Sequence, residues 1–397
     1  MQVNYRPTVA EIDLDALESN YREFRQVLPE GMKLLVCVKA NAYGHGAVQV
    51  AREMQRLQAD YLSVAFLDEA IELRRAGITM PILVLGYTSP DGVQTALEHD
   101  ITLCLFDEDV LEAARHLETG DSGKRLKVHI KVDTGMGRIG LLPEETVQFV
   151  QQAVRVPALE VEGLFTHFAT ADEEDKSYTL TQYRRFQAVA EALRERNIRV
   201  PIIHTGNSAT AIDLPEISCD MVRIGIAMYG LYPSDEVDRQ KVKLTPVLSL
   251  KTQLTYVKDL PPHWGISYGK RYETQDKEMI GTLPIGYADG YSRMLGGKAQ
   301  VLIRGRRVPV VGTICMDQCM VSLQAFMQET EQIQAGEEAV LIGRQHGGEI
   351  SAGELASWLG TIHYEVICMV ANRVPRLYKK AGHPDLMVNP LLRSVPE

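Results

Sequence analysis

The stretch "KLLVCVKANAYGHG" (residues 33–46) is an apolar run that ends in a lysine and a string of turn-forming residues. Its first half has the composition of a strand that is covered on both faces. Lysine is among the residues least often buried without a partner, so Lys39 requires an explanation. Two interpretations are open: a strand end where the amine reaches water, or an amine with a lowered pKa that acts as a nucleophile or base.

Seven similar apolar runs follow the first. They are "YLSVAF" (61–66), "PILVLGY" (81–87), "ITLCLF" (101–106), "KVHIKVD" (127–133), "LEVEGLFTHF" (159–168), "VPIIHTG" (200–206) and "DMVRIGI" (220–226). Polar stretches of helical character separate them, such as residues 68–77 and 175–197. Eight buried strands that alternate with helices predict an α/β fold, a parallel (β/α)8 TIM-type barrel. A doubly wound open sheet is the alternative, but no G-x-G-x-x-G follows the first strand.

The pattern of the sequence changes after residue 240 from alternating strands and helices to mostly strands. Strand-like segments with Gly, Pro and Asp turns follow: "TPVLSLKTQLTYVKDL" (245–260), "EMIGTLPIGYADGY" (278–291), "QVLIRGRRVPVVGTICMDQCMVSL" (300–323) and "EEAVLIGRQ" (337–345). We therefore expect a barrel domain at 1–240 and a mostly-β C-terminal domain at 241–397. A helix near 351–360 and a last strand at 364–378 should close the second domain. The alternating segment 8–17 is expected to pair with that β domain.

Length and charge limit the classes of function. A chain of 397 residues is long enough for two domains, and its formal net charge of -10 argues against nucleic-acid and anionic-membrane partners. The N-terminal residues do not resemble a signal peptide, and no apolar run reaches membrane-spanning length. The six cysteines are scattered without zinc spacing, so we expect no metal site and a cytoplasmic protein with reduced thiols.

The catalytic residues of such a barrel lie at the carboxyl ends of its strands. Reading those ends gives a set of polar and turn residues: Lys39, Tyr43, Lys131, Arg138, His167, His204, Asn207, Ser208, Arg223, Gly225 and Ile226. The set fits a phosphorylated cofactor that bears an aldehyde. A lysine would form the Schiff base, while Ser208 and the Gly225 and Ile226 amides would hold the phosphate. Pyridoxal 5'-phosphate has those requirements.

Eight motifs, in family order and over nearly the whole chain, resemble those of alanine racemases. They are the Lys39 motif quoted above, "KVDTGMGRIG" (131–140), "THFATAD" (166–172), "HTGNSA" (204–209), "VRIGIAMYG" (222–230), "GISYG" (265–269), "IGYADGY" (285–291) and "CMDQCM" (315–320). The resemblance implies a barrel that binds pyridoxal phosphate, followed by a β domain. It also implies interconversion of L-alanine and D-alanine by a homodimer with composite active sites, which would supply D-alanine for peptidoglycan.

The resemblance implies two catalytic bases. Lys39 would carry the cofactor and act on one face of the substrate Cα, and Tyr268 of the partner subunit would act on the other. The reference pKa of tyrosine is near 10, so a base at neutral pH needs nearby positive charge or hydrogen bonds. By resemblance, His167 supplies a hydrogen bond to this tyrosine.

Arg223 has an unusual role by resemblance. Many enzymes that use this cofactor place a carboxylate at its ring nitrogen, whereas this family places an arginine there, supported by His204. Arginine cannot accept the proton that would make the ring a deeper electron sink. A weaker sink disfavours transamination as a side reaction.

The remaining roles also come from the resemblance. Arg138 would meet the substrate carboxylate, and Lys131 is often carbamylated in the family. Tyr43, Ser208, Gly225, Ile226 and Tyr364 match phosphate-holding positions. Met316 matches a partner-subunit contact to the substrate carboxylate, Tyr287 lines the access passage, and Cys315, Asp317 and Asn207 are supporting residues. This chain has Gly206 where alanine is common.

Other functions remain open from the residues. A racemase of serine or of a broader amino-acid range is the first alternative. A barrel-type amino-acid decarboxylase is the second, but it would place an acidic residue where Arg223 stands. A non-catalytic protein that binds pyridoxal phosphate is the third, although such proteins usually lack the β domain that carries Tyr268.

Overall fold

The computed structural model describes residues 4–120, 123–327 and 332–392. The chain forms two compact units. The barrel unit comprises Ala16–Ala42 and Ala47–Thr245. The β unit comprises the chain before Ala16, the segment Tyr43–Gly46 and the chain from Pro246 onward. The β unit is therefore discontinuous in sequence.

Eight parallel strands form the barrel unit, in the order β8-β7-β6-β5-β4-β3-β2-β9. Their bounds are β2 (Lys33–Cys37), β3 (Tyr61–Val64), β4 (Ile82–Val84), β5 (Thr102–Leu105), β6 (Leu126–Lys131), β7 (Leu159–Phe165), β8 (Ile202–His204) and β9 (Met221–Ile224). Backbone hydrogen bonds from Asp220 to Ile203 (2.8 Å) and from Arg223 to Gly206 (3.1 Å) connect the two ends of this order. Each strand overlaps one predicted apolar run, and the nearly closed barrel confirms the predicted fold.

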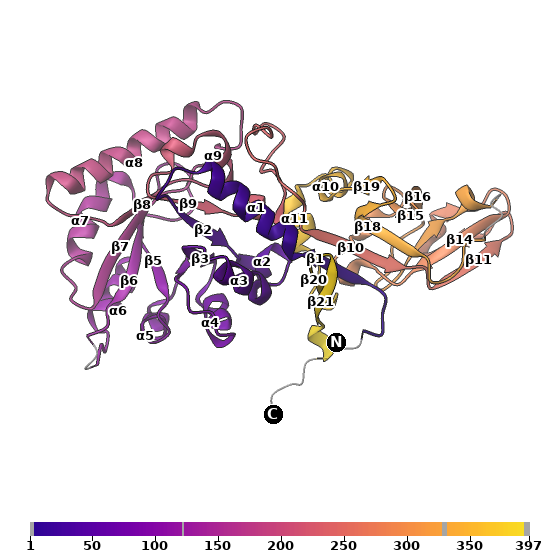
Figure 1. Ribbon diagram of the computed structural model, residues 1–397, viewed down its shortest axis with the longest axis horizontal. Helices are drawn as coiled ribbons and strands as arrows, with labels where there is room; N and C mark the ends of the chain where they lie inside the picture. Colours follow the sequence, from indigo (N-terminus) through magenta and orange to yellow (C-terminus); the bar gives the residue numbers. More distant parts are fainter. Residues whose placement is uncertain (1–3, 121–122, 328–331, 393–397) are drawn as a thin grey trace. The chain divides into compact units, whose positions relative to one another are not determined.

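Helices lie outside these strands (Figure 1); α1 precedes the first of them, and the others connect one strand to the next. They include α1 (Leu14–Val27), α3 (Ala47–Arg56), α4 (Leu67–Arg75), α5 (Val93–Glu98), α6 (Glu108–Arg115), α7 (Pro143–Ala153), α8 (Ser177–Glu195) and α9 (Ser208–Asp213). Helix α3 buries Val50, Ala51 and Met54, which share one face at helical spacing. The Asp107 side chain caps α6 by accepting from the backbone amides of Asp109 and Val110. Apolar periodicity and capping thus explain why these segments are helical.

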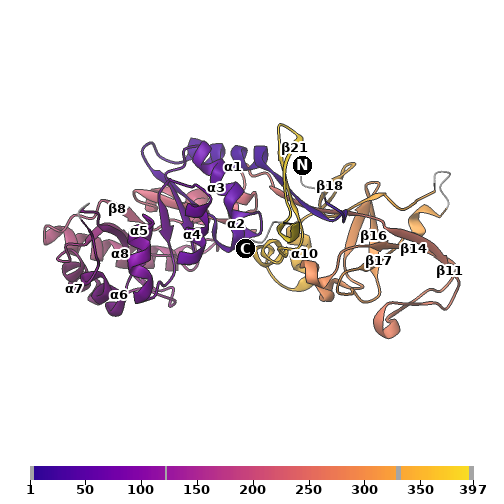
Figure 2. The same cartoon turned by 90° about the horizontal axis from the view of Figure 1, so that it is seen from below.

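The β unit contains a sheet in the order β11-β14-β17-β16-β15-β18-β10-β1-β20-β21, with β19 paired to β18. The bounds are β1 (Val9–Asp13), β10 (Leu248–Gln253), β11 (Tyr256–Leu260), β14 (Glu278–Leu283), β15 (Gln300–Ile303), β16 (Arg306–Val311), β17 (Cys319–Ser322), β18 (Glu338–Gln345), β19 (Gly348–Ile350), β20 (Arg376–Lys380) and β21 (His383–Val388). Strand β1 pairs antiparallel with β10 and parallel with β20. Figure 2 shows β14, β16 and β17 grouped in this unit. The N-terminal strand is thus held on both edges by the C-terminal part of the chain.

The expected last strand at 364–378 is wrong in its first part. Helix α10 (Ala352–Leu359) is followed by a second helix, α11 (His363–Cys368), and the strand begins only at Arg376. The apolar residues Val366, Ile367 and Val370 are buried at spacings that fit a helix face. A short apolar run does not distinguish a helix from a strand, which explains the error.

The segment "FMQETEQIQAGEE" (326–338), which we expect to be a surface loop, lies partly outside the described residues, because it includes residues 328–331. The C-terminal tail after residue 383, for which the sequence indicates no role, includes residues 393–397, which also lie outside them. Within the parts of the chain that the structure describes, no helix combines the length and the apolar character needed to cross a membrane.

Candidate functional site

The carboxyl ends of the barrel strands collect the predicted cofactor residues of the barrel unit. Lys131 is the last residue of β6, His204 is the last residue of β8, and Arg223 lies within β9. Lys39 follows β2, and His167 follows β7 by two residues. Because the strands are parallel, these side chains emerge at one end of the barrel.

Lys39 begins a left-handed turn, α2 (Lys39–Tyr43), which was not expected from the sequence. The φ angles of the next three residues are 52°, 55° and 53°. This conformation costs a non-glycine residue about 1–2 kcal/mol. The Glu69 carboxylate holds the turn, since its Oε1 accepts from the Ala40 amide at 2.6 Å and its Oε2 from the Ala65 amide at 2.7 Å. A strained turn, held by Glu69, therefore presents Lys39 directly after β2.

Arg223 is buried and held by four acceptors. Its Nη2 donates to the backbone oxygens of Thr166 (2.9 Å) and Thr205 (3.0 Å), and to Nδ1 of His167 at 3.2 Å. Its Nη1 donates to Nδ1 of His204 at 3.0 Å. Hydrogen bonds to the described residues use only Nη1 and Nη2, which leaves Nε–H for an acceptor from a ligand. The guanidinium is thus fixed in orientation, and its Nε–H makes no hydrogen bond to the described residues.

The two histidines beside Arg223 are neutral. Burial, followed by the positive charge of Arg223, places the pKa of both His167 and His204 well below the usual histidine value. Each imidazole accepts at Nδ1, so its proton is on Nε2. His167 is expected to hydrogen-bond Tyr268, and its Nε2–H is the donor that remains for such a bond.

Lys131 carries a buried amine next to an aromatic ring. Its Nζ has no hydrogen-bond acceptor among the described residues, and it lies 4.5 Å from the centre of the Phe165 ring. Burial, and then the charge of Arg223, lower the pKa of Lys131 to about 7. A large fraction of this amine is therefore uncharged and nucleophilic at neutral pH.

A compact loop after β6 carries Arg138. The Asp133 carboxylate accepts from the backbone amides of Gly135 (2.9 Å), Met136 (2.9 Å) and Gly137 (3.1 Å). Burial alone would raise the pKa of Asp133, but these three amides lower it below its usual value. The Arg138 side chain is exposed and makes no ion pair within the described residues. The loop is ordered, while its guanidinium is available to an anionic ligand.

The expected phosphate-holding residues of the barrel unit lie where β8 and β9 end. Ser208 is buried, and its Oγ accepts from the Gly225 amide at 2.9 Å. Asn207 caps α9 by accepting from the Thr210 amide at 3.0 Å. Ile226, the next residue after Gly225, begins a buried 3-10 turn. The Ser208 hydroxyl therefore keeps its own hydrogen for an anion.

Tyr268 lies in the β unit on the loop between β12 (Gly265–Ile266) and β13 (Tyr272–Glu273). Its side chain is 74% exposed. Its backbone oxygen accepts from Thr313 Oγ1 at 2.9 Å, and the Ser267 hydroxyl donates to the Thr313 backbone oxygen. The loop is therefore anchored through its backbone, while the phenol is free of the unit that carries it.

The motif residues Tyr287, Cys315, Met316 and Asp317 lie together in the β unit. The Tyr287 amide donates to the Cys315 backbone oxygen at 3.1 Å, and the next amide donates to the Met316 oxygen at 3.1 Å. Arg373 pairs with Asp317 at 2.6 Å. Met316 is 52% exposed and Tyr287 is 41% exposed. The two loops thus support each other and present their side chains outward.

Tyr43 and Tyr364, the other two expected phosphate-holding residues, are also neighbours within the β unit. Their ring centres are 6.5 Å apart, at an angle of 52°. Tyr43 is buried and Tyr364 is half-buried. The structure thus gathers the predicted residues into two sets, one in each unit.

Sequence reasoning missed three polar residues near the barrel site: Glu69, His129 and Glu162. Glu69 braces the turn after Lys39, and His129 hydrogen-bonds both His204 and Glu162. One signal was available: Lys127, His129 and Lys131 alternate along β6. Residues two apart on a strand share a face, so basic residues recur on one side of it.

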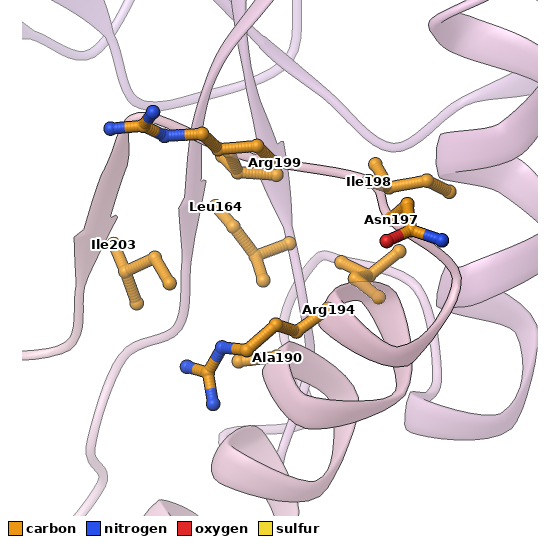
Figure 3. Close-up of a pocket in the computed structure, with 9 residues that line it drawn as sticks. Leu164, Ala190, Arg194, Asn197, Ile198, Arg199 and Ile203 are labelled. Atoms are coloured by element: carbon orange, nitrogen blue, oxygen red, sulfur yellow. The ribbon is translucent and has the colours of Figure 1, made fainter.

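A hollow of about 450 Å³ lies between α8 and the outer face of the barrel sheet (Figure 3). Leu164, Ala190 and Ile203 contribute apolar side chains, and the exposed arginines Arg194 and Arg199 also line it. None of the predicted site residues lines this hollow, so it is separate from the barrel site.

Comparison with known proteins gives the family. The alanine racemase N-terminal domain matches residues 12–233, and the alanine racemase C-terminal domain matches residues 247–378. An alanine racemase of Clostridium perfringens is 45% identical over 98% of this chain and 100% of its own length. One of Desulforamulus reducens is 47% identical, over 94% of this chain and 99% of its own. The solved alanine racemase of Clostridium difficile 630 superposes with a TM-score of 0.91 at 41% identity, covering 98% of this chain and 100% of that one. The chain therefore belongs to the alanine racemase family.

Proposed function

We propose that this protein interconverts L-alanine and D-alanine with pyridoxal 5'-phosphate, using Lys39 on one face of the substrate Cα and Tyr268 of the partner subunit on the other. The observation that carries the proposal is the buried Arg223, which four acceptors orient at the barrel end that also presents Lys39. The D-alanine formed would supply peptidoglycan.

The barrel-end residues fit this cofactor. The Nε–H of Arg223 has no acceptor among the described residues, and a ring nitrogen is an acceptor. The Ser208 hydroxyl, whose oxygen accepts from the Gly225 amide, would hold the phosphate together with the Ile226 amide and the hydroxyls of Tyr43 and Tyr364. Lys39 would hold the aldehyde carbon. When bound, the cofactor withdraws electrons from the substrate Cα and so makes its hydrogen acidic.

The two bases have distinct roles in this proposal. The Lys39 amine removes or returns the Cα proton on one face, and the Tyr268 hydroxyl does so on the opposite face. Arg223 would donate to the ring nitrogen and, because it cannot give up its own proton, would leave that nitrogen unprotonated. The reaction is thereby limited to moving one proton.

Substrate binding would use the free guanidinium of Arg138, whose two parallel donors suit a carboxylate. The uncharged Lys131 amine is suited to add carbon dioxide, which forms an N–C bond, releases one proton and leaves a carbamate anion. That anion would accept from Arg138 and would also balance the charge of Arg223. We place Lys131 in this modified form in the active enzyme.

A homodimer would complete the site. Tyr268, Met316 and Tyr287 are exposed in the β unit, and each matches a family position that faces the substrate or its passage. Exposed side chains of this size are available to a second copy of the chain. Pairing two copies would supply each barrel with a tyrosine from its partner.

The test uses purified protein with pyridoxal phosphate in deuterium oxide. L-alanine, D-alanine, L-serine and L-glutamate are supplied separately, and chiral chromatography and Cα–H exchange are followed. We expect both alanines to interconvert, little reaction of the others and no release of carbon dioxide. A preference for serine would reassign the substrate, and release of carbon dioxide would indicate a decarboxylase.

Two variants test the assignment of the bases. Lys39→Ala should lose covalent cofactor binding and exchange of both enantiomers. Tyr268→Phe should lose exchange more for one enantiomer than for the other, because only one face loses its base. Equal loss for both enantiomers would argue against one base per face.

A further inference from the structure

Four buried side chains form a continuous hydrogen-bonded chain inside the barrel, which we call the relay: Arg223, His204, His129 and Glu162. Arg223 Nη1 is 3.0 Å from His204 Nδ1, and His204 Nε2 is 2.8 Å from His129 Nδ1. His129 Nε2 is 3.1 Å from Glu162 Oε2. None of the four side chains is exposed, and both imidazoles are fully buried.

The two ends of the relay fix the direction of every hydrogen bond in it. The arginine at one end can only donate, and an ionised carboxylate at the other end can only accept. Burial alone would raise the pKa of Glu162, but hydrogen bonds from His129 and Lys127 lower it to about 2, so the carboxylate is ionised. His204 and His129 must therefore each accept at Nδ1 and donate from Nε2. Both imidazoles are held in a single neutral tautomer.

Close packing surrounds both imidazole rings of the relay. Phe165 stacks on His204 with ring centres 4.7 Å apart and planes within 1°. A Cβ atom on Gly163 would lie 2.3 Å from His129 Nδ1, so only glycine at that position admits the ring. At the far end, Lys127 pairs with the second oxygen of Glu162 at 2.8 Å. Neighbouring side chains therefore support the relay along its whole length.

We propose that His129 and Glu162 are positioning residues for the racemase: through the tautomer of His204, they hold Arg223 so that its Nε–H is directed at the cofactor ring nitrogen. This inference rests on the proposed function. Without the carboxylate, His129 is free to take either tautomer, and His204 then loses its fixed acceptor. A His204 that carried its proton on Nδ1 would present a donor to a donor, and Arg223 would lose its Nη1 anchor.

The first experiment measures the tautomers directly, in full-length protein without cofactor or substrate. Nitrogen NMR of isotope-labelled histidine distinguishes the two neutral tautomers, and His204→Gln assigns the His204 signal. We expect a single Nε2–H form of His204 in the unmodified protein and in Glu160→Gln. Glu160→Gln is the matched control, because it also removes a carboxylate from β7. The Glu160 carboxylate pairs with Arg125 at the surface and is not part of the relay. We expect a mixture of His204 tautomers in Glu162→Gln.

A second pair of variants serves if Glu162→Gln does not fold. In His129→Gln the amide oxygen can still accept from His204, whereas in His129→Leu no acceptor remains. We expect His204 to keep its tautomer in the first variant and to lose it in the second. The same tautomer in both would overturn the relay.

The loaded enzyme provides the functional measurement. Glu162→Gln should lower kcat for alanine by roughly tenfold or more, the worth of one hydrogen bond to a charged group, while KM changes little. The absorbance of the bound cofactor should shift as well, and neither should change in Glu160→Gln. An unchanged kcat and spectrum in Glu162→Gln would leave the relay a purely structural feature. If the unmodified protein fails to racemise alanine, the proposed function fails, and the NMR measurement still decides the relay.

Discussion

The guanidinium of Arg223 donates from Nη1 to Nδ1 of His204 across 3.0 Å, inside a site where both side chains are buried. The contact fixes a permanently charged donor next to a neutral imidazole. It also separates the proposed racemase from the decarboxylase alternative, which requires an acidic residue at this place. In the proposed function, the group at the cofactor ring nitrogen is therefore a donor that cannot become an acceptor.

Replacing Arg223 with lysine keeps the positive charge but removes the planar guanidinium with its several N–H donors. Lysine has no second nitrogen with which to reach His204 together with the carbonyls of Thr166 and Thr205. We expect the free energy of unfolding to fall by about 1–3 kcal/mol, because buried acceptors are left without donors. Urea unfolding measures this, with the exposed Arg239→Lys as control. Equal stability of the two variants would contradict the contacts described for Arg223.

The pKa of Lys131 makes stability depend on pH. Its folded-state pKa is about 7, below the ordinary lysine value, so the unfolded chain binds the proton more tightly. Stability should therefore rise as pH increases above 7, by about 2–3 kcal/mol between pH 7 and pH 9 from this one group. Urea unfolding without bicarbonate, across this range, measures the slope.

The control for that slope is Lys131→Met, which fills the same space without a charge. We expect the variant to lack the rise and to be the more stable protein at pH 7. Parallel curves for both proteins would show that Lys131 is not responsible. Adding bicarbonate to the unmodified protein should further stabilise it, if the amine forms a carbamate.

The barrel was predictable because parallel strands buried on both faces are continuous apolar runs. Leu34, Leu35 and Val36 of β2 are all fully buried. The site was predictable as far as it lies at strand ends. The contact between His129 and Glu162 was not, since it joins residues 33 apart through the pairing of β6 with β7. The left-handed turn after Lys39 could not be predicted for a similar reason. Glu69, which accepts the hydrogen bond from the Ala40 amide in this turn, comes from the next βα unit.

Gly206 packs against Ser218 too closely for any side chain. A Cβ atom at residue 206 would lie 2.2 Å from Ser218 Oγ and 2.7 Å from its Cβ. Gly206→Ala should therefore destabilise the protein by about 1–3 kcal/mol through overpacking. Thermal unfolding measures the loss, and Ser218→Gly in the same chain should recover most of it. A double variant as unstable as the single one would place the strain elsewhere.

Tyr268→Phe should separate activity from stability. The side chain is 74% exposed, and the contacts that hold its loop are made by the backbone oxygen and by Ser267, which the substitution leaves intact. We expect the free energy of unfolding to change by less than about 0.5 kcal/mol, as for most exposed substitutions. Racemisation should fall by roughly 10²–10⁴-fold, the range for loss of a general base. Tyr256→Phe, also exposed on the β unit, is the matched control and should leave both quantities unchanged. If the two variants racemise alanine equally well, Tyr268 is not a base and the second face of the substrate must be served by another group.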